Sequence, residues 1–149
     1  LNSLTDYYRT LTMKTLNPYI NFSGHCQDAL SFYETALNGK VIMRQTFGQA
    51  PQAVPGVNPT KIMHAEFKAE GIYFMATDGM TPSPAADSNK ITLNIAFDDA
   101  DEQVNVFNAL SHNGEIKMAL NETFWGARFG IVKDQFGISW MLNHQLEIK

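Results

Sequence analysis

Hydrophobic and polar positions follow two different spacings along this chain. Between Cys26 and Leu37 apolar residues recur every three or four positions, the spacing of an amphipathic helix. The same order of segments returns later and predicts a second helix over Ala100–Ser111. Short segments of alternating or continuous apolar character surround both helices and predict strands. The expected strands are residues 17–22, 41–47, 62–68 and 72–77 in the first half, and 91–97, 115–120, 128–133 and 138–143 in the second half.

An internal repeat explains why the two halves share this order. The segment from Ile20 to Met43 returns 75 positions later as Ile95 to Met118. A second block, residues 71–75, returns 66 positions later as residues 137–141. The difference of nine residues falls in the segment 48–60 of the first copy, which holds three prolines and is expected to be a long irregular connection. The repeat therefore predicts two βαβββ modules.

Length and composition favour one globular domain of the α+β class. With 149 residues and 44% hydrophobic content, the chain can bury one good core shared by the two modules. We expect an N-terminal appendage at residues 1–14, a first module at 15–80 and a second module at 90–145. The segment 81–89, which is rich in Pro, Ser and Ala, is expected to be the linker.

Charge and cysteine content exclude several classes of partner. The net charge is -4, and the eleven Lys and Arg residues are scattered, so a nucleic-acid-binding surface is not expected. No apolar stretch approaches the roughly 18 residues of a membrane span, so no membrane partner is expected. The single cysteine excludes an internal disulfide. These features indicate a cytoplasmic protein.

Four motifs resemble one known family. They are NPYINF at 17–22, ALSFY at 29–33, TFWG at 123–126 and DQFGISWM at 134–141. Together with the repeat, they resemble the PhnB-like subfamily of the vicinal oxygen chelate superfamily, which includes glyoxalase I, extradiol dioxygenases and bleomycin-resistance proteins. The resemblance covers residues 16–143. It implies two βαβββ modules that form a curved mixed sheet around a cavity, a homodimer, and a small-molecule ligand.

The same resemblance brings a label that the residues do not support. Chains of this kind sometimes carry the name of a ubiquinone methyltransferase. No glycine-rich loop follows a strand here in the way that would cradle S-adenosylmethionine. We therefore expect no such cofactor.

The resemblance also implies where a metal would bind. Enzymes of the superfamily place one metal ligand on the first strand and one on the fourth strand of each module. The corresponding positions here are Asn17 or Pro18, Met75, Thr92 and Met141. Thioethers prefer soft ions, and a lone hydroxyl or amide binds weakly. We therefore expect neither a divalent metal nor any other cofactor.

Side-chain alternation predicts which residues line the cavity. On the strand face that carries metal in the enzymes, we expect Asn17, Tyr19, Asn21, Thr92 and Asn94. Buried amides need hydrogen-bond partners, so either water or a polar ligand should meet them. Their neighbours along each strand are expected to face the helices.

His64 is the titratable residue of most interest. If Ala69-Glu70 forms a two-residue hairpin turn, His64 lies opposite Met75 and points into the cavity. There it could act as a general base, as a ligand-orienting group or as a lone metal ligand. The alternative is a half-exposed or core histidine that pairs with Glu66.

A loop with aromatic residues is the second candidate. Phe124 and Trp125 could form the wall of a small-molecule pocket, and Arg128 could meet a carboxylate or phosphate. The same aromatics could be core or dimer contacts, and Glu122 could neutralise Arg128. The candidate ligand-binding residues are Tyr19, Asn21, Met75, Thr92, Asn94, Trp125, Arg128 and Met141, with His64 as the candidate catalytic residue.

The remaining titratable residues have ordinary predicted roles. We expect His25, His112 and His144 at the surface, and Cys26 as a buried small apolar residue. The segment 48–60 could act as a lid over the pocket or could be slack.

Two functional hypotheses follow from these patterns. The first is a homodimer that binds or sequesters a small organic molecule without the usual divalent metal. The second is a vicinal-oxygen-chelate-type enzyme, a lyase, isomerase or dioxygenase, that uses His64 as base or metal ligand. A structural interaction module would be favoured if the cavity proved to be filled by side chains.

Overall fold

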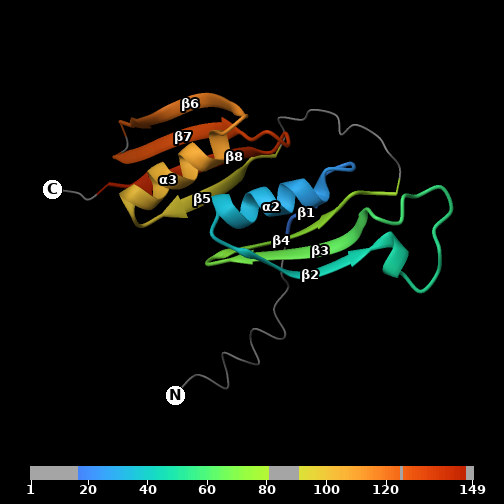
Figure 1. The fold of residues 1–149 in the computed structure, drawn as a ribbon. Helices are drawn as coiled ribbons and strands as arrows, with labels where there is room; N and C mark the ends of the chain where they lie inside the picture. The colour runs from blue at the N-terminus through green and yellow to red at the C-terminus, as the bar shows by residue number, and fades with distance from the viewer. Residues whose placement is uncertain (1–16, 81–90, 125, 147–149) are drawn as a thin grey trace, which may run out of the picture.

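The computed structural model describes residues 17–80, 91–124 and 126–146, and its elements follow the predicted order (Figure 1). The first module contains β1 (Tyr19–Asn21), α2 (Cys26–Ala36), β2 (Lys40–Thr46), η1 (Phe47–Gln49), β3 (Ile62–Ala69) and β4 (Ile72–Thr77). The second contains β5 (Leu93–Phe97), α3 (Ala100–Ser111), β6 (Glu115–Glu122), β7 (Ala127–Lys133) and β8 (Ser139–Gln145). The α+β class and the paired βαβββ order are confirmed. The predicted appendage at 1–14 and linker at 81–89 lie outside the described residues.

Each module forms its own four-stranded mixed sheet. The strand orders are β1-β4-β3-β2 and β5-β8-β7-β6. In both sheets the first strand of the module pairs in parallel with the last, and the other pairs are antiparallel. The helices α2 and α3 lie between the two sheets, so each sheet turns one face toward the helices and one face away from them (Figure 1). The strands thus curve as two separate sheets within one chain.

Helix α2 begins where the carboxylate of Asp78, the residue that follows β4, accepts a hydrogen bond from the first backbone amide of the helix. The residue before the helix, His25, makes no side-chain cap. Instead, Oδ1 of the buried Asp78 accepts from the Cys26 N–H at 2.8 Å, and its Oδ2 accepts from the Ile62 N–H at 2.8 Å. Asp78 therefore joins the end of β4 to the start of α2 and to β3. Helix α3 is capped locally, because Asp99 Oδ1 accepts from the Asp101 N–H at 3.0 Å.

An Asn-Gly pair follows each helix, and it is the Asn, not the Gly, that takes the left-handed backbone conformation. Asn38 and Asn113 adopt the left-handed backbone, with φ of 52° and 56°. The glycines are required by close packing instead. A Cβ on Gly39 would lie 2.4 Å from the ring of Phe67, and one on Gly114 would lie 2.5 Å from the Lys133 carbonyl oxygen.

One buried core joins the two modules, with Tyr33 of α2 at its centre. The ring of Tyr33 contacts Phe74 of its own module at 5.6 Å between centroids and Trp140 of the other module at 5.8 Å. Its hydroxyl donates to Asp134 Oδ2 at 2.5 Å. Burial, and secondly the Asp134 carboxylate, raise the pKa of Tyr33 well above its usual value, so the phenol stays protonated.

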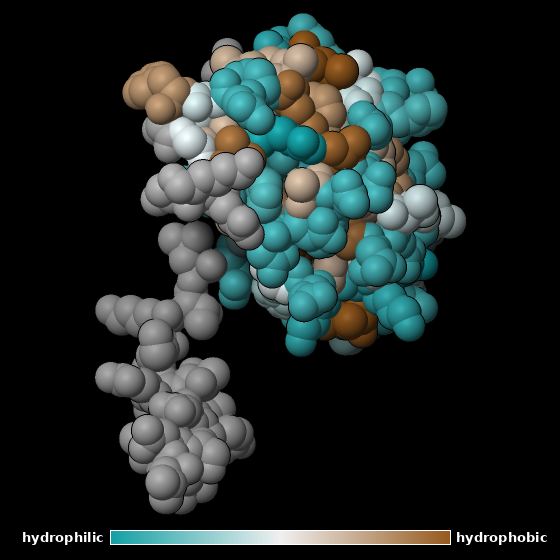
Figure 2. All heavy atoms as spheres, turned by 90° about the vertical axis from the view of Figure 1, so that its left-hand side faces the viewer, coloured by the Kyte–Doolittle hydropathy of each residue, from teal (hydrophilic) through white to brown (hydrophobic). Residues whose placement is uncertain are grey.

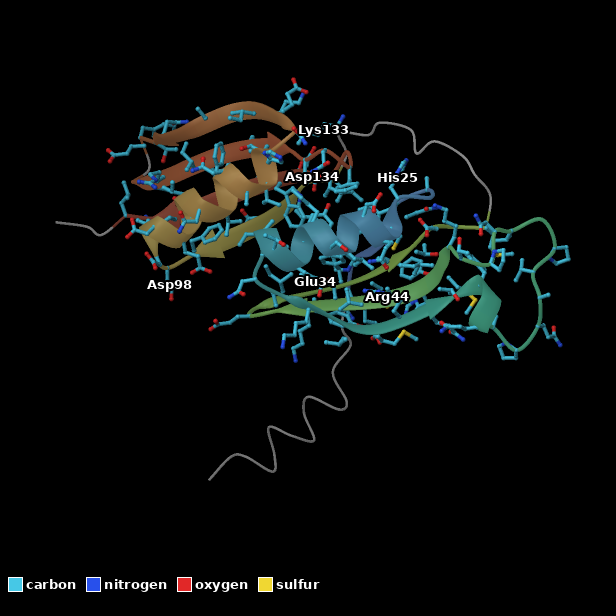
Figure 3. All side chains as sticks on the ribbon, in the orientation of Figure 1. His25, Glu34, Arg44, Asp98, Lys133 and Asp134 are labelled. Carbon is cyan, nitrogen blue, oxygen red and sulfur yellow. The ribbon has the colours of Figure 1, made fainter. Side chains whose placement is uncertain are left out.

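Asp134 lies where the second module meets α2 (Figure 3). Its Oδ2 also accepts from Trp140 Nε1 at 2.8 Å. Its Oδ1 accepts from the backbone amides of Phe136 and Ile138 at 2.9 and 3.0 Å. One buried carboxylate therefore shapes the β7–β8 turn and binds the first module to the second.

The segment 48–60 is irregular, as expected, and its base is held by backbone hydrogen bonds. The Phe47 N–H donates to the Lys61 carbonyl at 3.0 Å, and the Gly48 N–H donates to the Pro59 carbonyl at 2.9 Å. Phe47 is buried below this base. A role for the segment as a lid stays a prediction.

Candidate functional site

The turn between β3 and β4 sets which residues face one another. The turn is formed by Glu70 and Gly71, with Gly71 at a φ of 73°. Glu66, not His64, therefore lies opposite Met75. The predicted turn at Ala69-Glu70 is wrong by one position, and this shifts the pairing by two residues. Because side chains alternate with a period of two, His64 stays on the predicted face.

A row of four side chains crosses the first sheet on the face turned away from the helices. Tyr19 pairs with Met75, Met75 with Glu66, and Glu66 with Met43. Their neighbours in sequence on β3 and β4 are buried against the helices, which fixes the direction of the row. We use the name open face A for the surface formed by Tyr19, Asn21, Met43, Gln45, His64, Glu66, Tyr73 and Met75.

Two close contacts organise the titratable groups of open face A. The Tyr73 hydroxyl donates to Glu66 Oε1 in a short hydrogen bond. This hydrogen bond is the main cause that raises the pKa of Tyr73. The ring of Tyr19 stacks on the ring of His64, with centroids 5.8 Å apart and planes 20° apart. Tyr19 is 54% exposed, whereas His64 and Glu66 are half-buried.

The predicted amide of Asn21 is partly used within the chain. Its Oδ1 accepts from the Ser23 N–H at 2.8 Å. Thr77, which follows Met75 on the same face, is buried, and its hydroxyl donates to the Met63 carbonyl at 2.7 Å. The amide nitrogen of Asn21 thus remains the part of this side chain that can meet a ligand.

The second sheet has an equivalent face with different chemistry. Asn94 pairs with Met141, Met141 with Ile131, and Ile131 with Met118. The next row contains Ala96, Asn143, Phe129 and Asn121. We use the name open face B for the surface formed by Asn94, Met118, Asn121, Phe129, Ile131, Met141 and Asn143. The side chains of open face B are apolar or amides. The carboxylate, the phenols and the imidazole are found on open face A instead.

The two open faces do not meet within one chain. Each open face lies on the side of its own sheet that is turned away from the helices, so open face A and open face B are separate surfaces of one chain (Figure 1). The predicted residues Tyr19, Asn21, His64 and Met75 are brought together on face A. Asn94 and Met141 are brought together on face B, and the half-buried Thr92 lies just before β5. A single chain does not enclose these two groups in one cavity.

Arg128 is directed to the helix side of the second sheet. Its Nε donates to Gln103 Oε1 at 3.2 Å, and its Nη2 donates to the Ala100 carbonyl at 3.3 Å. These two donor groups of Arg128 are therefore used within the chain, and its binding to a carboxylate or phosphate stays a prediction. Trp125, which was expected in the same candidate pocket as Arg128, lies outside the described residues. The neighbouring Phe124 is 98% exposed.

Gln103 is a buried polar residue that the sequence reasoning missed. It is fully buried, and its Nε2 donates to the carbonyls of Arg128 at 2.9 Å and of Leu142 at 3.1 Å. Its position in line with Val106 and Leu110 on the apolar side of α3 was the available signal. Gln103 thus positions β7, β8 and Arg128 and has no free group for a ligand.

The exposure of the other histidines and of the cysteine mostly agrees with the prediction. His25 and His112 are exposed. His144 belongs to β8 and is half-buried, with Nδ1 2.9 Å from the Phe97 carbonyl oxygen, so the expected surface role is wrong for this residue. Cys26 is fully buried as predicted. Burial, and secondly Asp78, raise the pKa of its thiol to about 12, so it is no nucleophile at neutral pH.

Two hollows lie at the junction between the modules. One of about 500 Å³ is lined by the end of α2, the β3–β4 turn, the end of β5 and the start of α3. This end of the molecule is seen in Figure 2, where polar residues predominate and apolar residues show between them. The other, of about 510 Å³, is lined by Phe22, Phe32, Phe136 and polar neighbours. Neither hollow includes a residue of open face A.

At the strand positions where enzymes of the superfamily bind a metal, the described side chains are poor ligands for a hard divalent ion. In the described ranges, no group of three or more His, Cys, Asp and Glu side chains could hold a metal ion. Met75 and Met141 occupy fourth-strand positions, and their thioethers are poor ligands for such ions. None of the helices that the structure describes is long and apolar enough to cross a membrane.

Comparison with known proteins assigns the chain to a family. Residues 14–143 match the family model described as 3-demethylubiquinone-9 3-methyltransferase. Protein YjdN of Escherichia coli is 35% identical over 86% of this chain and 93% of its own length. The crystal structure of PA1353 from Pseudomonas aeruginosa is 32% identical, with a TM-score of 0.80, over 91% of this chain and 100% of that one.

The solved structures also confirm the fold. A Bacillus cereus protein described as a putative 3-demethylubiquinone-9 3-methyltransferase, PhnB protein, has a TM-score of 0.74 at 23% identity. The match covers 88% of this chain and 99% of that protein, and this likeness concerns the fold alone. The resemblance seen in the four sequence motifs is thereby confirmed. The chain has the glyoxalase fold and belongs to the PhnB-like family whose model carries the methyltransferase description.

Proposed function

We propose that this protein binds or sequesters a small organic molecule on open face A, without the usual divalent metal. The observation that supports the proposal most is the row Tyr19–Met75–Glu66–Met43, with His64 beside it. Ring and thioether surfaces flank a carboxylate there, which is the mixture of apolar walls and few polar groups found in small-molecule sites. The setting we propose is the cytoplasm.

A second copy of the chain would complete the site. Open face A is a surface in one chain, and open face B presents Met118 at 43% exposure next to apolar and amide side chains. If open face B of one copy covers open face A of another, an apolar wall closes over a polar floor. Two such sites form in one closed dimer with twofold symmetry.

The proposal excludes the activity in the family's description. A methyltransferase needs a site for its methyl donor, and the glycine-rich loop that would cradle S-adenosylmethionine is missing from this sequence. Among the described glycines with positive φ, Gly71 and Gly137 lie in turns between neighbouring strands and shape hairpins. Gly24 lies just before α2, but no second glycine stands near it in sequence, so it does not form a glycine-rich loop there.

The alternative is an enzyme of the vicinal oxygen chelate type. One observation favours it: the imidazole of His64 is half-buried on open face A and is held against the Tyr19 ring. A neutral histidine in that position could take a proton from a bound substrate. Under this alternative, His64→Gln would abolish turnover of a substrate while leaving its binding within about threefold.

The dimer is tested with two matched substitutions on β6. Met118→Lys places a charge on open face B, whereas Ile116→Lys places the same charge on the opposite side of the strand, where Ile116 is 53% exposed. Sedimentation velocity should show a dimer for the parent and for Ile116→Lys, and a monomer for Met118→Lys. A monomeric parent at all concentrations contradicts the two-copy site.

Metal content and ligand binding are tested on the same untagged protein. Elemental analysis after purification without chelators should give far less than one metal per chain, before and after soaking in Zn²⁺, Ni²⁺, Fe²⁺ or Mn²⁺. Near-stoichiometric metal that is lost in His64→Ala would overturn the metal-free assignment. Organic compounds that raise the melting temperature of the parent should fail to do so for Met75→Glu on open face A.

A further inference from the structure

We propose that open face A selects an organic cation, an ammonium or quaternary ammonium group on an apolar body, through the Glu66 carboxylate. The inference rests on the proposed function, because it names the ligand class of the same site. The charge, orientation and surroundings of this one residue support it.

The Glu66 carboxylate is held in a fixed position and keeps binding capacity. The Tyr73 hydroxyl donates to its Oε1, which orients the group across β3 and β4. No hydrogen bond to Oε2 is found from the residues that the structure describes. A carboxylate can accept about four hydrogen bonds. An ammonium group that approaches Oε2 therefore meets an acceptor whose direction is already set.

The charge of Glu66 is not neutralised by a side chain of the described chain. Glu66 forms no ion pair with a described Lys or Arg, and the pair found elsewhere is Lys117–Glu115 at 3.0 Å. Lys68 lies two positions along the same strand, is exposed, and pairs across the sheet with Lys40 and Tyr73. A half-buried carboxylate without a cation in contact attracts a cationic ligand.

The surroundings of Glu66 suit a cation with an apolar body better than a metal ion. The thioethers of Met43 and Met75 lie directly across the strands on either side. The stacked rings of Tyr19 and His64 stand on the adjoining strand positions. Aromatic faces attract quaternary ammonium groups, and methionine side chains adapt to ligand shape. Hydrated inorganic cations gain little from such walls.

The experiment uses a charged probe and its neutral isostere. Choline and 3,3-dimethyl-1-butanol have the same shape and differ in one positive charge, and phenyltrimethylammonium adds an aromatic body. Binding is followed by NMR in full-length protein labelled with ¹³C at the methionine methyl groups. Met43 and Met75 resonances are assigned with Met→Leu variants. We expect choline and phenyltrimethylammonium to shift both resonances and 3,3-dimethyl-1-butanol to bind about tenfold more weakly.

Two substitutions test the residues that the inference names. Glu66→Gln keeps the shape and the acceptor for Tyr73 but removes the charge, and it should weaken phenyltrimethylammonium binding about tenfold. Tyr73→Phe should weaken it about threefold, because the carboxylate loses its orienting partner. Glu70→Gln, in the exposed β3–β4 turn, is the matched control and should leave binding unchanged.

The possible results separate the inference from the proposed function. If the neutral isostere shifts Met43 and Met75 as strongly as choline does, or if Glu66→Gln binds the cations unchanged, the cation preference is overturned and the organic-ligand site stands. If inorganic phosphate shifts these resonances and the cations do not, Lys68 governs the face and the inference is wrong. If no organic probe shifts either resonance, both proposals fail.

Discussion

Replacing Asp134 by Asn tests whether one carboxylate holds the two modules together. Asp134 is 3% exposed and accepts four hydrogen bonds, from Tyr33, Trp140 and the amides of Phe136 and Ile138. In the Asp134→Asn variant the side-chain oxygen can keep the two backbone amides, which turns the NH₂ group toward the two side chains. The Tyr33 hydroxyl can rotate and accept from it. The Trp140 N–H cannot, and becomes a buried donor without an acceptor.

The magnitude follows from that one unpaired donor. A buried unsatisfied group costs about 1–3 kcal/mol, so we expect Asp134→Asn to lower the free energy of unfolding by about 2 kcal/mol. For a domain of this size, that loss lowers Tm by about 4–8 °C. Tyr33→Phe removes a hydrogen bond to a charged acceptor and should cost about 1.5–3 kcal/mol.

Urea unfolding followed by tryptophan fluorescence and by circular dichroism measures both variants. The control is Asp98→Asn, an exposed carboxylate at the start of α3, which should change the stability by less than about 0.5 kcal/mol. If Asp134→Asn behaves like this control with an unchanged m value, Asp134 does not bind the modules together and the reasoning is refuted.

Three further predictions concern single residues. Gly39→Ala should destabilise the fold by about 1–3 kcal/mol in urea, because its Cβ would lie 2.4 Å from the Phe67 ring; a neutral effect would contradict the close approach. Cys26 should resist thiol reagents at pH 8 in the native protein and react in denaturant. Burial raises the pKa of the Cys26 thiol from 9.0 to about 12. The buried protonated thiol therefore contributes its full stability below pH 9, and this contribution is lost between pH 9 and about 12. Urea unfolding at each pH would show this loss. Tyr73 should titrate above a free tyrosine in a difference ultraviolet spectrum, and Glu66→Gln should lower its pKa; an unchanged titration would exclude the hydrogen bond in solution.

Local patterns were sufficient to predict most of the fold. Every predicted helix and strand is present, because the periods of 2 and 3.6 residues depend on which side of each element is buried. The internal repeat predicted that both modules would have the same order of helix and strands along the chain, and they do. Alternation along β1 and β3 also assigned Tyr19, Asn21 and His64 to the correct face.

Pairing between strands was predicted less well, because it depends on a turn. The hairpin turn lies at Glu70-Gly71, one position beyond the expected site, since Gly71 supplies the positive φ. That single step replaced His64 by Glu66 opposite Met75. The hydrogen bond between Glu66 and Tyr73 could not be foreseen from the incorrect register.

The tertiary structure alone decided how the modules face one another. The sequence determined which side of each sheet is apolar, and burial of that side requires a cover. It did not determine that the two helices would lie between the sheets, with Tyr33 reaching Asp134 of the other module. Asp134, Gln103 and Arg128 form hydrogen bonds with groups distant in sequence, so the sequence did not reveal which partners they would meet inside the chain. Composition and periodicity specify what must be buried, whereas contacts between distant segments decide what covers it and which side chains remain for a ligand.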